Sequence, residues 1–83
     1  MVVSGDGGLI TIFPNPVSDG TFYVSSTVNC RRIRLMDVIG RLILDKEAQG
    51  YLQTISVQNL ARGIYLVVVD TDTGRQVQKV FVK

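Results

Sequence analysis

The fold is decided by the stretch GIYLVVVDTDTGRQVQKVFV, residues 63–82. Apolar and mostly β-branched residues fill Ile64–Val69, and a second such segment, Arg75–Val82, follows the turn-forming residues Thr71–Gly74. Two short segments of this kind around a turn are typical of a β-hairpin. Because Ile64–Val69 is apolar on both faces of a strand, we expect it to be central and fully buried in its sheet.

The second strand of this hairpin breaks its own alternation. Val77 and Phe81 fall on one face of an extended chain, whereas Val80 and Val82 fall on the other. The pattern predicts either a bulge near Gln78–Lys79 or a strand that is covered on both faces at its end. We also expect this last strand to lie at the edge of its sheet.

In the rest of the chain, apolar and polar residues alternate within short segments. Apolar residues recur at every second position rather than at the helical period, so no window predicts a helix of ordinary length. A type I turn with a left-handed glycine, followed by a bulge, is expected at both Asp37–Gly40 and Thr71–Gly74. The sequence predicts an all-β antiparallel sandwich of about seven strands, whose other members are Leu9–Phe13, Thr21–Ser26, Arg32–Met36, Arg41–Lys46 and Gln53–Val57.

The 83 residues allow a single domain. Residues 1–8, rich in glycine, are predicted to be a flexible linker, with Met1 as an added start residue. Residues 9–83 are predicted to form the folded domain. The longest apolar segment is far shorter than the ~20 residues that a membrane-spanning helix needs. Because Met1–Gly5 lacks the basic and apolar regions of a signal peptide, the chain is expected to be either cytoplasmic or a piece of a longer exported protein.

The composition argues against most kinds of catalytic and metal-binding site. The chain has no histidine and one cysteine, so a catalytic triad, a disulfide within the chain and a thiolate metal site are excluded. We expect no enzyme, cofactor or metal, and Cys30 is interpreted as a small apolar residue near a strand end. Nine basic against seven acidic residues give a net charge of +2, too small to indicate a nucleic-acid partner. The segment Asp70–Gly74 resembles the start of a calcium loop but lacks later ligands, so a plain hairpin turn is expected.

Three local features are candidates for recognition. Phe13–Pro16 (FPNP) predicts a stiff exit from the first strand that leaves the Asn15 amide free to bond a neighbouring loop, either as a structural corner or as a surface that a partner recognises. Gly63 would allow a sharp turn into its strand, and Tyr65 is expected to bury its ring while its hydroxyl finds a partner. The basic cluster Arg31–Arg34 predicts either a solvated face or a contact surface for an acidic partner.

Four segments occur together and in order: Phe13-Pro14-Asn15-Pro16, Asp37-Val38-Ile39-Gly40-Arg41, Leu60-Ala61-Arg62-Gly63-Ile64-Tyr65-Leu66-Val67 and Lys79-Val80-Phe81-Val82-Lys83. Together they resemble the C-terminal domain of proteins exported by the type IX (Por) secretion system of Bacteroidetes, over Leu9–Lys83. The resemblance implies an immunoglobulin-like β-sandwich that directs an upstream cargo protein across the outer membrane. It implies recognition positions at Pro14, Asn15, Pro16, Asp37, Gly40, Arg41, Gly63, Tyr65, Lys79, Val80, Val82 and Lys83.

The resemblance also implies partners and a route. The domain would be held in the periplasm until the type IX translocon recognises it, and the cargo would end at the outer membrane, at the cell surface or outside the cell. A surface sortase usually removes such domains and attaches the cargo to lipopolysaccharide, with cleavage in the neighbourhood of the linker through Gly8. The final edge strand could offer unpaired backbone groups to a receptor, or to a second copy by strand exchange.

Two other functions remain open from the residues themselves. An immunoglobulin-like adhesion or carbohydrate-binding module would need exposed aromatic side chains on one face, and only Tyr23 and Tyr51 are candidates. A passive spacer domain in a multidomain enzyme would need no site at all.

Overall fold

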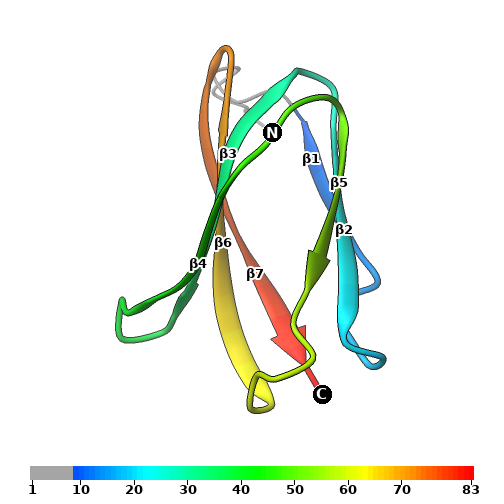
Figure 1. The fold of residues 1–83 in the computed structure, drawn as a ribbon, viewed down its shortest axis with the longest axis vertical. Coiled ribbons are helices and arrows are strands. Elements are labelled where there is room, and N and C mark those ends of the chain that lie inside the picture. Colours follow the sequence, from blue (N-terminus) through cyan, green and yellow to red (C-terminus); the bar gives the residue numbers. More distant parts are fainter. Residues whose placement is uncertain (1–8) are drawn as a thin grey trace.

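A computed structural model describes residues 9–83, which form seven β-strands and no helix (Figure 1). The predicted all-β class is confirmed, and each predicted strand is present to within two residues at its ends. The linker prediction for residues 1–8 lies outside the described residues. The strands are β1 (Ile10–Phe13), β2 (Thr21–Ser26), β3 (Cys30–Asp37), β4 (Leu42–Glu47), β5 (Leu52–Ser56), β6 (Gly63–Thr71) and β7 (Gly74–Val82).

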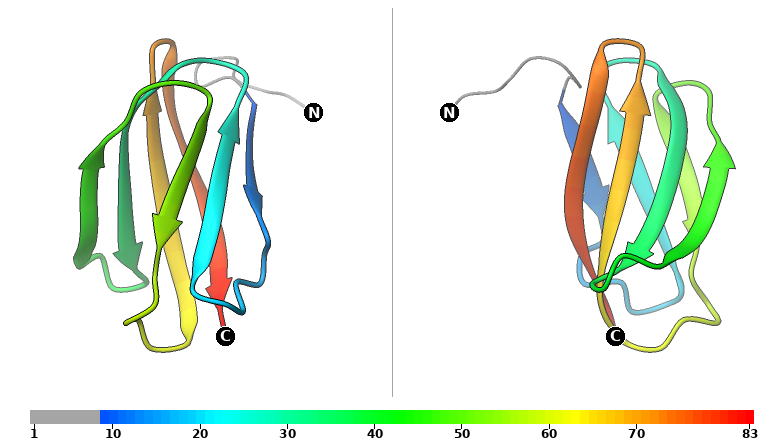
Figure 2. Two further views of the ribbon diagram at one scale, coloured as in Figure 1. Left: turned by 45° about the vertical axis from the view of Figure 1, so that its right-hand side comes forward. Right: turned by 90° about the vertical axis from the view of Figure 1, so that its left-hand side faces the viewer.

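The strands form two antiparallel sheets that pack face to face (Figures 1 and 2). One sheet has the order β1-β2-β5, and the other has the order β4-β3-β6-β7. Alternate side chains of both sheets point between them and make the core, as the period of two in the sequence requires. The largest of these core side chains, each at most 1 % exposed, are Phe22, Ile33, Leu35 and Ile55.

The central position predicted for β6 is confirmed, but the strand is not fully buried. Val67, Val68 and Val69 are buried, whereas Ile64 is 41 % exposed and Leu66 is half-buried. The outer face of the four-stranded sheet has no further layer over it (Figure 2). Outward side chains of β6 are therefore covered only by their neighbours on β3 and β7.

Strand β7 lies at the edge of the four-stranded sheet, as expected, but both explanations of its broken alternation are wrong. Its register with β6 runs without a shift from Thr71↔Gly74 to Gly63↔Val82, so there is no bulge. Val77 and Phe81 point outward and are 54 % and 46 % exposed. Apolar side chains on the solvent face, and not a slip of the strand, cause the change of pattern.

The two glycine turns differ. In the β3–β4 turn, Gly40 has a φ of +92° and its N–H donates to the Asp37 carbonyl at 3.1 Å. The β3–β4 ladder shifts register between Leu35 and Met36, so the predicted bulged hairpin is confirmed there. In the β6–β7 turn Gly74 has a φ of +155° and pairs directly with Thr71, so the bulge predicted there is absent.

Cys30 is fully buried at the start of β3, which agrees with its interpretation as a small apolar residue. Burial raises the pKa of its thiol above the ordinary value, and a hydrogen bond with Ser26 offsets part of that effect. The thiol is therefore kept in its neutral form.

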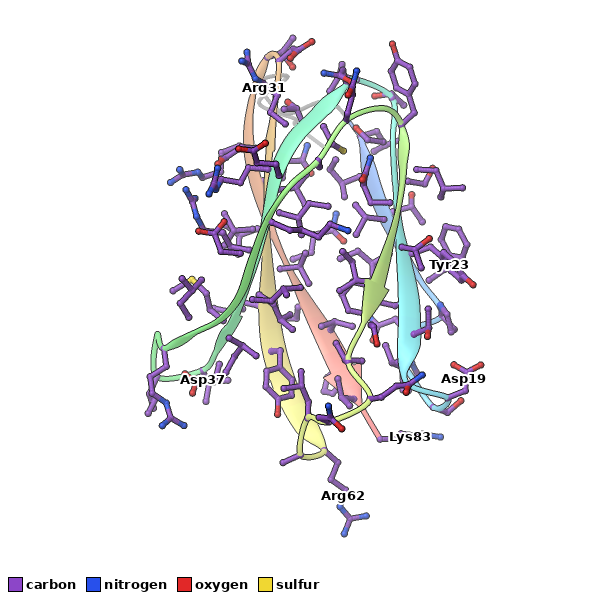
Figure 3. All side chains as sticks on the ribbon, viewed as in Figure 1. Asp19, Tyr23, Arg31, Asp37, Arg62 and Lys83 are labelled. Carbon is purple, nitrogen blue, oxygen red and sulfur yellow. The ribbon has the colours of Figure 1, made fainter. Side chains whose placement is uncertain are left out.

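The loops gather at two opposite ends of the sandwich (Figures 1 and 3). One end holds loops 14–20, 38–41 and 57–62 together with Lys83, and we call it the motif pole. The other end, where β1 starts, holds loops 27–29, 48–51 and 72–73, and we call it the opposite pole. Figure 3 shows Asp37, Arg62 and Lys83 at the motif pole and Arg31 at the opposite pole.

Candidate recognition site

The side chain of Asn15 binds the free edge of β7. Its Oδ1 accepts a hydrogen bond from the Phe81 N–H at 3.0 Å, and its Nδ2 donates to the Lys79 carbonyl at 3.3 Å. The prediction that the rigid Pro-Asn-Pro segment frees this amide for a bond is confirmed, but the partner is a strand and not a loop. The amide takes the place that a neighbouring strand would have.

Val17 continues this cover along the same edge. Its N–H donates to the Phe81 carbonyl at 2.7 Å, and its carbonyl accepts from the Lys83 N–H at 2.8 Å. The side chain of Val17 is fully buried, and its backbone forms a parallel bridge with Val82. The backbone groups that were expected to be unpaired in the terminal segment are therefore already bonded. A receptor strand, or a second copy, would first have to displace Asn15 and Val17 there.

The Asp37 carboxylate organises the β3–β4 turn. It accepts the Arg41 N–H at 2.8 Å, the Ile39 N–H at 3.1 Å and the Arg41 Nε–H at 2.9 Å. The hydrogen bond from the Arg41 backbone, followed by the one from its side chain, lowers the pKa of this carboxyl below its usual range. Asp37, Gly40 and Arg41 thus act as one turn that presents Val38 and Ile39 to solvent.

Three of the four motifs meet in one row across the four-stranded sheet. Asp37 on β3 pairs with Tyr65 on β6, and Tyr65 pairs with Val80 on β7. The Tyr65 ring is buried, and its hydroxyl donates to the Ala61 carbonyl at 2.6 Å, as expected for a core tyrosine. The Asn15 amide bonds β7 on both sides of Val80, so the fourth motif joins the same row.

The predicted positions differ in their access to solvent. Val80, Val82 and Tyr65 are core residues, so their side chains help to hold the pole together. Pro16, Gly63 and Lys83 line a groove of about 520 Å³, and Val82 also contributes to its lining. Asp37, Gly40 and Arg41 lie in the β3–β4 turn and do not line this groove.

Three residues of this groove were missed from the sequence: Arg62, Ile64 and Phe81. Ile64 and Phe81 are paired across β6 and β7 on the outer face. The break in alternation at Phe81 was the available signal, because an apolar residue out of phase with its buried neighbours has to face solvent in a regular edge strand.

The arginines of β3 bind carboxylates of the same chain. Arg32 Nε lies 2.6 Å from Asp45 Oδ1, and Arg34 lies 3.3 Å from an oxygen of Asp70, which Arg75 also contacts at 2.7 Å. Hydrogen bonding to Arg32 lowers the pKa of the Asp45 carboxyl. Of the two readings of this cluster, a solvated face with internal ion pairs fits the structure. Asp70 also belongs to the hairpin that was expected in place of a calcium loop.

The aromatic side chains named for a carbohydrate-binding surface do not lie together. Tyr23 packs against Phe13, its cross-strand partner, with ring centroids 5.5 Å apart. Tyr51 lies in the loop before β5, at the opposite pole. Within residues 9–83 no cluster of metal-ligating side chains occurs, and no helix is long and apolar enough to cross a membrane.

Comparisons with known proteins point to one family. A sequence model described as "Secretion system C-terminal sorting domain" matches residues 11–83. An endo-acting ulvan lyase of Formosa agariphila is 31 % identical over 78 residues, which are 89 % of this chain but only 15 % of the lyase. Among solved structures, PorZ, an essential surface component of the type IX secretion system of Porphyromonas gingivalis, matches with a TM-score of 0.76. That match is 20 % identical and covers 96 % of this chain and 12 % of PorZ, so it supports the fold.

Proposed function

Since the chain belongs to the family of type IX secretion system C-terminal sorting domains, which mark proteins for export, we propose that its motif pole is the surface that the export machinery reads. The observation that carries this proposal is the convergence of the four motifs. Segments that lie up to 66 residues apart in sequence are bonded to each other at one end of the sandwich. A fold alone would not require the family's motifs to gather there.

The export machinery would read a folded surface rather than an extended tail. In the terminal motif, the side chains of Val80 and Val82 are buried in the core, and that of Phe81 points outward. The backbone of Phe81 is hydrogen-bonded to Asn15 and Val17. The motif therefore has its shape only when the sandwich is formed. A misfolded sorting domain would therefore lack the surface that the machinery recognises.

Membership of this family implies export to the outer membrane, the cell surface or the medium. The finer route is part of our proposal. Residues 9–83 form the sorting domain and residues 1–8 the linker to an upstream cargo. The domain waits in the periplasm, docks on the outer-membrane translocon, and is removed by a surface sortase near the linker while the cargo is joined to lipopolysaccharide.

The cargo, and not this domain, would carry any catalytic activity. The lyase relative supports this division, because its match to this chain is confined to 15 % of its length. An extracellular polysaccharide-degrading enzyme is the cargo class that this relative favours. The domain itself would act only through protein–protein contacts.

A fusion assay tests the function. Residues 1–83 are placed behind a fluorescent protein that is targeted to the periplasm of a cell with a type IX system. We expect fluorescence at the cell surface, or in the medium, and its loss in an isogenic strain without the outer-membrane translocon. Fluorescence that stays in the periplasm of the competent strain would refute the proposal.

A further inference from the structure

The groove at the motif pole is an apolar surface left open by the fold. Its apolar lining consists of Ile64 and Phe81, which are 41 % and 46 % exposed, together with Pro16 and the buried Val82. Gly63, also in the lining, leaves open space where a side chain would project. Large apolar side chains grouped in a hollow of about 520 Å³ are typical of a site that a partner fills.

Two cationic side chains line this hollow without an Asp or Glu side chain as partner in the described part of the chain. Arg62 and Lys83 are exposed and line the groove, and within residues 9–83 neither has an Asp or Glu side chain at ion-pair distance. Figure 3 shows both side chains extending from the motif pole into solvent. A ligand for this site would therefore gain from negative charge placed beside its apolar part.

The hollow at the opposite pole gives the contrast. It has a volume of about 720 Å³, and its lining includes Arg31, Arg32, Asp70 and Asp72. These groups bind one another or other charges of the chain, as in the contact of Arg31 with Asp72 at 3.7 Å. Side-chain charges are paired there, whereas those of Arg62 and Lys83 at the groove have no Asp or Glu partner within residues 9–83.

We propose that the groove of Pro16, Arg62, Gly63, Ile64, Phe81 and Lys83 binds a peptide segment of a partner protein that carries carboxylates beside one or two large apolar side chains. This inference rests on the proposed function, and it assigns a chemistry to the partner. Ile64 and Phe81 would take the apolar side chains, while Arg62 and Lys83 would bind the carboxylates. The acidic partner that the sequence suggested for the Arg31–Arg34 cluster is thereby placed at a different site.

A protein segment fits the groove better than an anionic membrane does. Interfacial membrane binding requires a broad apolar face that enters the headgroup region. Here the apolar part consists of Pro16, Ile64, Phe81 and Val82 in a hollow, and its size suits a few side chains.

The test is an NMR titration of the full 83-residue chain with synthetic hexapeptides. The probe has two Glu residues on each side of a Leu-Phe pair, one twin has Lys in place of every Glu, and another has Ser in place of Leu and Phe. We expect shifts of the Ile64 and Phe81 amides with the probe alone, and weaker binding at high salt. No saturable shift with the probe, or equal binding of the Lys twin, would overturn the inference.

Matched variants locate the site. Arg62→Glu with Lys83→Glu should weaken binding by about tenfold or more, while Arg31→Glu at the opposite pole should leave it unchanged. Phe81→Ser should also weaken it, and Val77→Ser, on the same face of β7 but outside the groove, should not. Dispersed spectra of each variant show that it is folded. Equal effects of groove and control variants would reject the site.

Three further outcomes can be told apart. Binding to phosphatidylglycerol vesicles without binding to the probe would assign the groove to a lipid and overturn the inference. Export of the wild-type fusion with no binding of the probe would overturn this inference and leave the proposed function standing. A fusion that stays in the periplasm of the competent strain would refute the proposed function whatever the titration shows.

Discussion

The side-chain amide of Asn15 is bonded to the backbone of Phe81, 66 residues later, with the Phe81 N–H donating to Oδ1 at 3.0 Å. The same amide donates to the Lys79 carbonyl at 3.3 Å, so it covers the strand edge on both sides of Val80. The first and the last motif of the chain are therefore one structural unit. A substitution in either motif should therefore alter the structure of the other.

Replacing Asn15 by Ala should destabilise the domain and open the end of β7. Two hydrogen bonds are lost, at about 0.5–1.5 kcal/mol each, and the exposure of the site favours the lower end of that range. We expect lower unfolding free energy in urea and faster hydrogen exchange of the Phe81 amide. Asn59→Ala, in the exposed β5–β6 loop, is the control. If the Phe81 amide exchanged at the wild-type rate in Asn15→Ala, the hydrogen bond from Phe81 to Asn15 would not protect this end of β7.

Replacement by alanine at two glycines of similar φ should lower the stability of the domain by different amounts. A Cβ on Gly20, at φ +83°, would meet Gln58 Cγ at 2.6 Å, whereas a Cβ on Gly40, at φ +92°, would meet no atom within 4 Å. Both replacements carry the backbone strain of about 1 kcal/mol or more that a side chain has in this region. Gly20→Ala adds a displacement of Gln58, so its unfolding midpoint in urea should be the lower of the two. The reverse order would contradict the packing described for the β1–β2 loop.

The Asp37 turn should make stability depend on pH in the acid range. Because its folded-state pKa is lowered, its contribution is present above the unfolded-state value of about 4 and is lost as pH falls below it. In Asp37→Asn the fall in unfolding free energy between pH 6 and pH 2.5 should be smaller than in the wild type. Unfolding in urea at a series of pH values measures this difference. Identical pH profiles would show that the Asp37 charge is not used in the fold.

Replacing Val80 by Asp should unfold the domain, and the loss of export that follows would say nothing about recognition. The Val80 side chain is fully buried, so an unpaired carboxylate would be placed in the core. Lys79→Glu, on the outward face of the same strand, should leave the circular dichroism spectrum and the unfolding midpoint close to those of the wild type. A folded Val80→Asp variant would contradict the core position of this residue.

Much of the fold follows from local pattern. Alternation, β-branched composition and turn residues located all seven strands, and the apolar run of β6 indicated its central place, because those signals are local. The outward direction of Phe81 was not predicted, since a parity break is equally consistent with a bulge. The binding of Asn15 to β7 could not be predicted either, because no local pattern identifies the partner of a polar side chain 66 residues away. The charged groove depends on that same long-range arrangement.

The measurement that tests the account most directly is export of a fluorescent fusion with single charge reversals at the two poles. Lys79→Glu and Lys83→Glu alter the terminal motif beside Asn15 and Val17, and Arg31→Glu makes the same change of charge at the opposite pole. All three are solvent-exposed sites, so folding should persist and can be checked by urea unfolding. We predict that surface fluorescence falls strongly for both lysine variants and stays at the wild-type level for Arg31→Glu. Equal export of all three folded variants would contradict recognition at the motif pole.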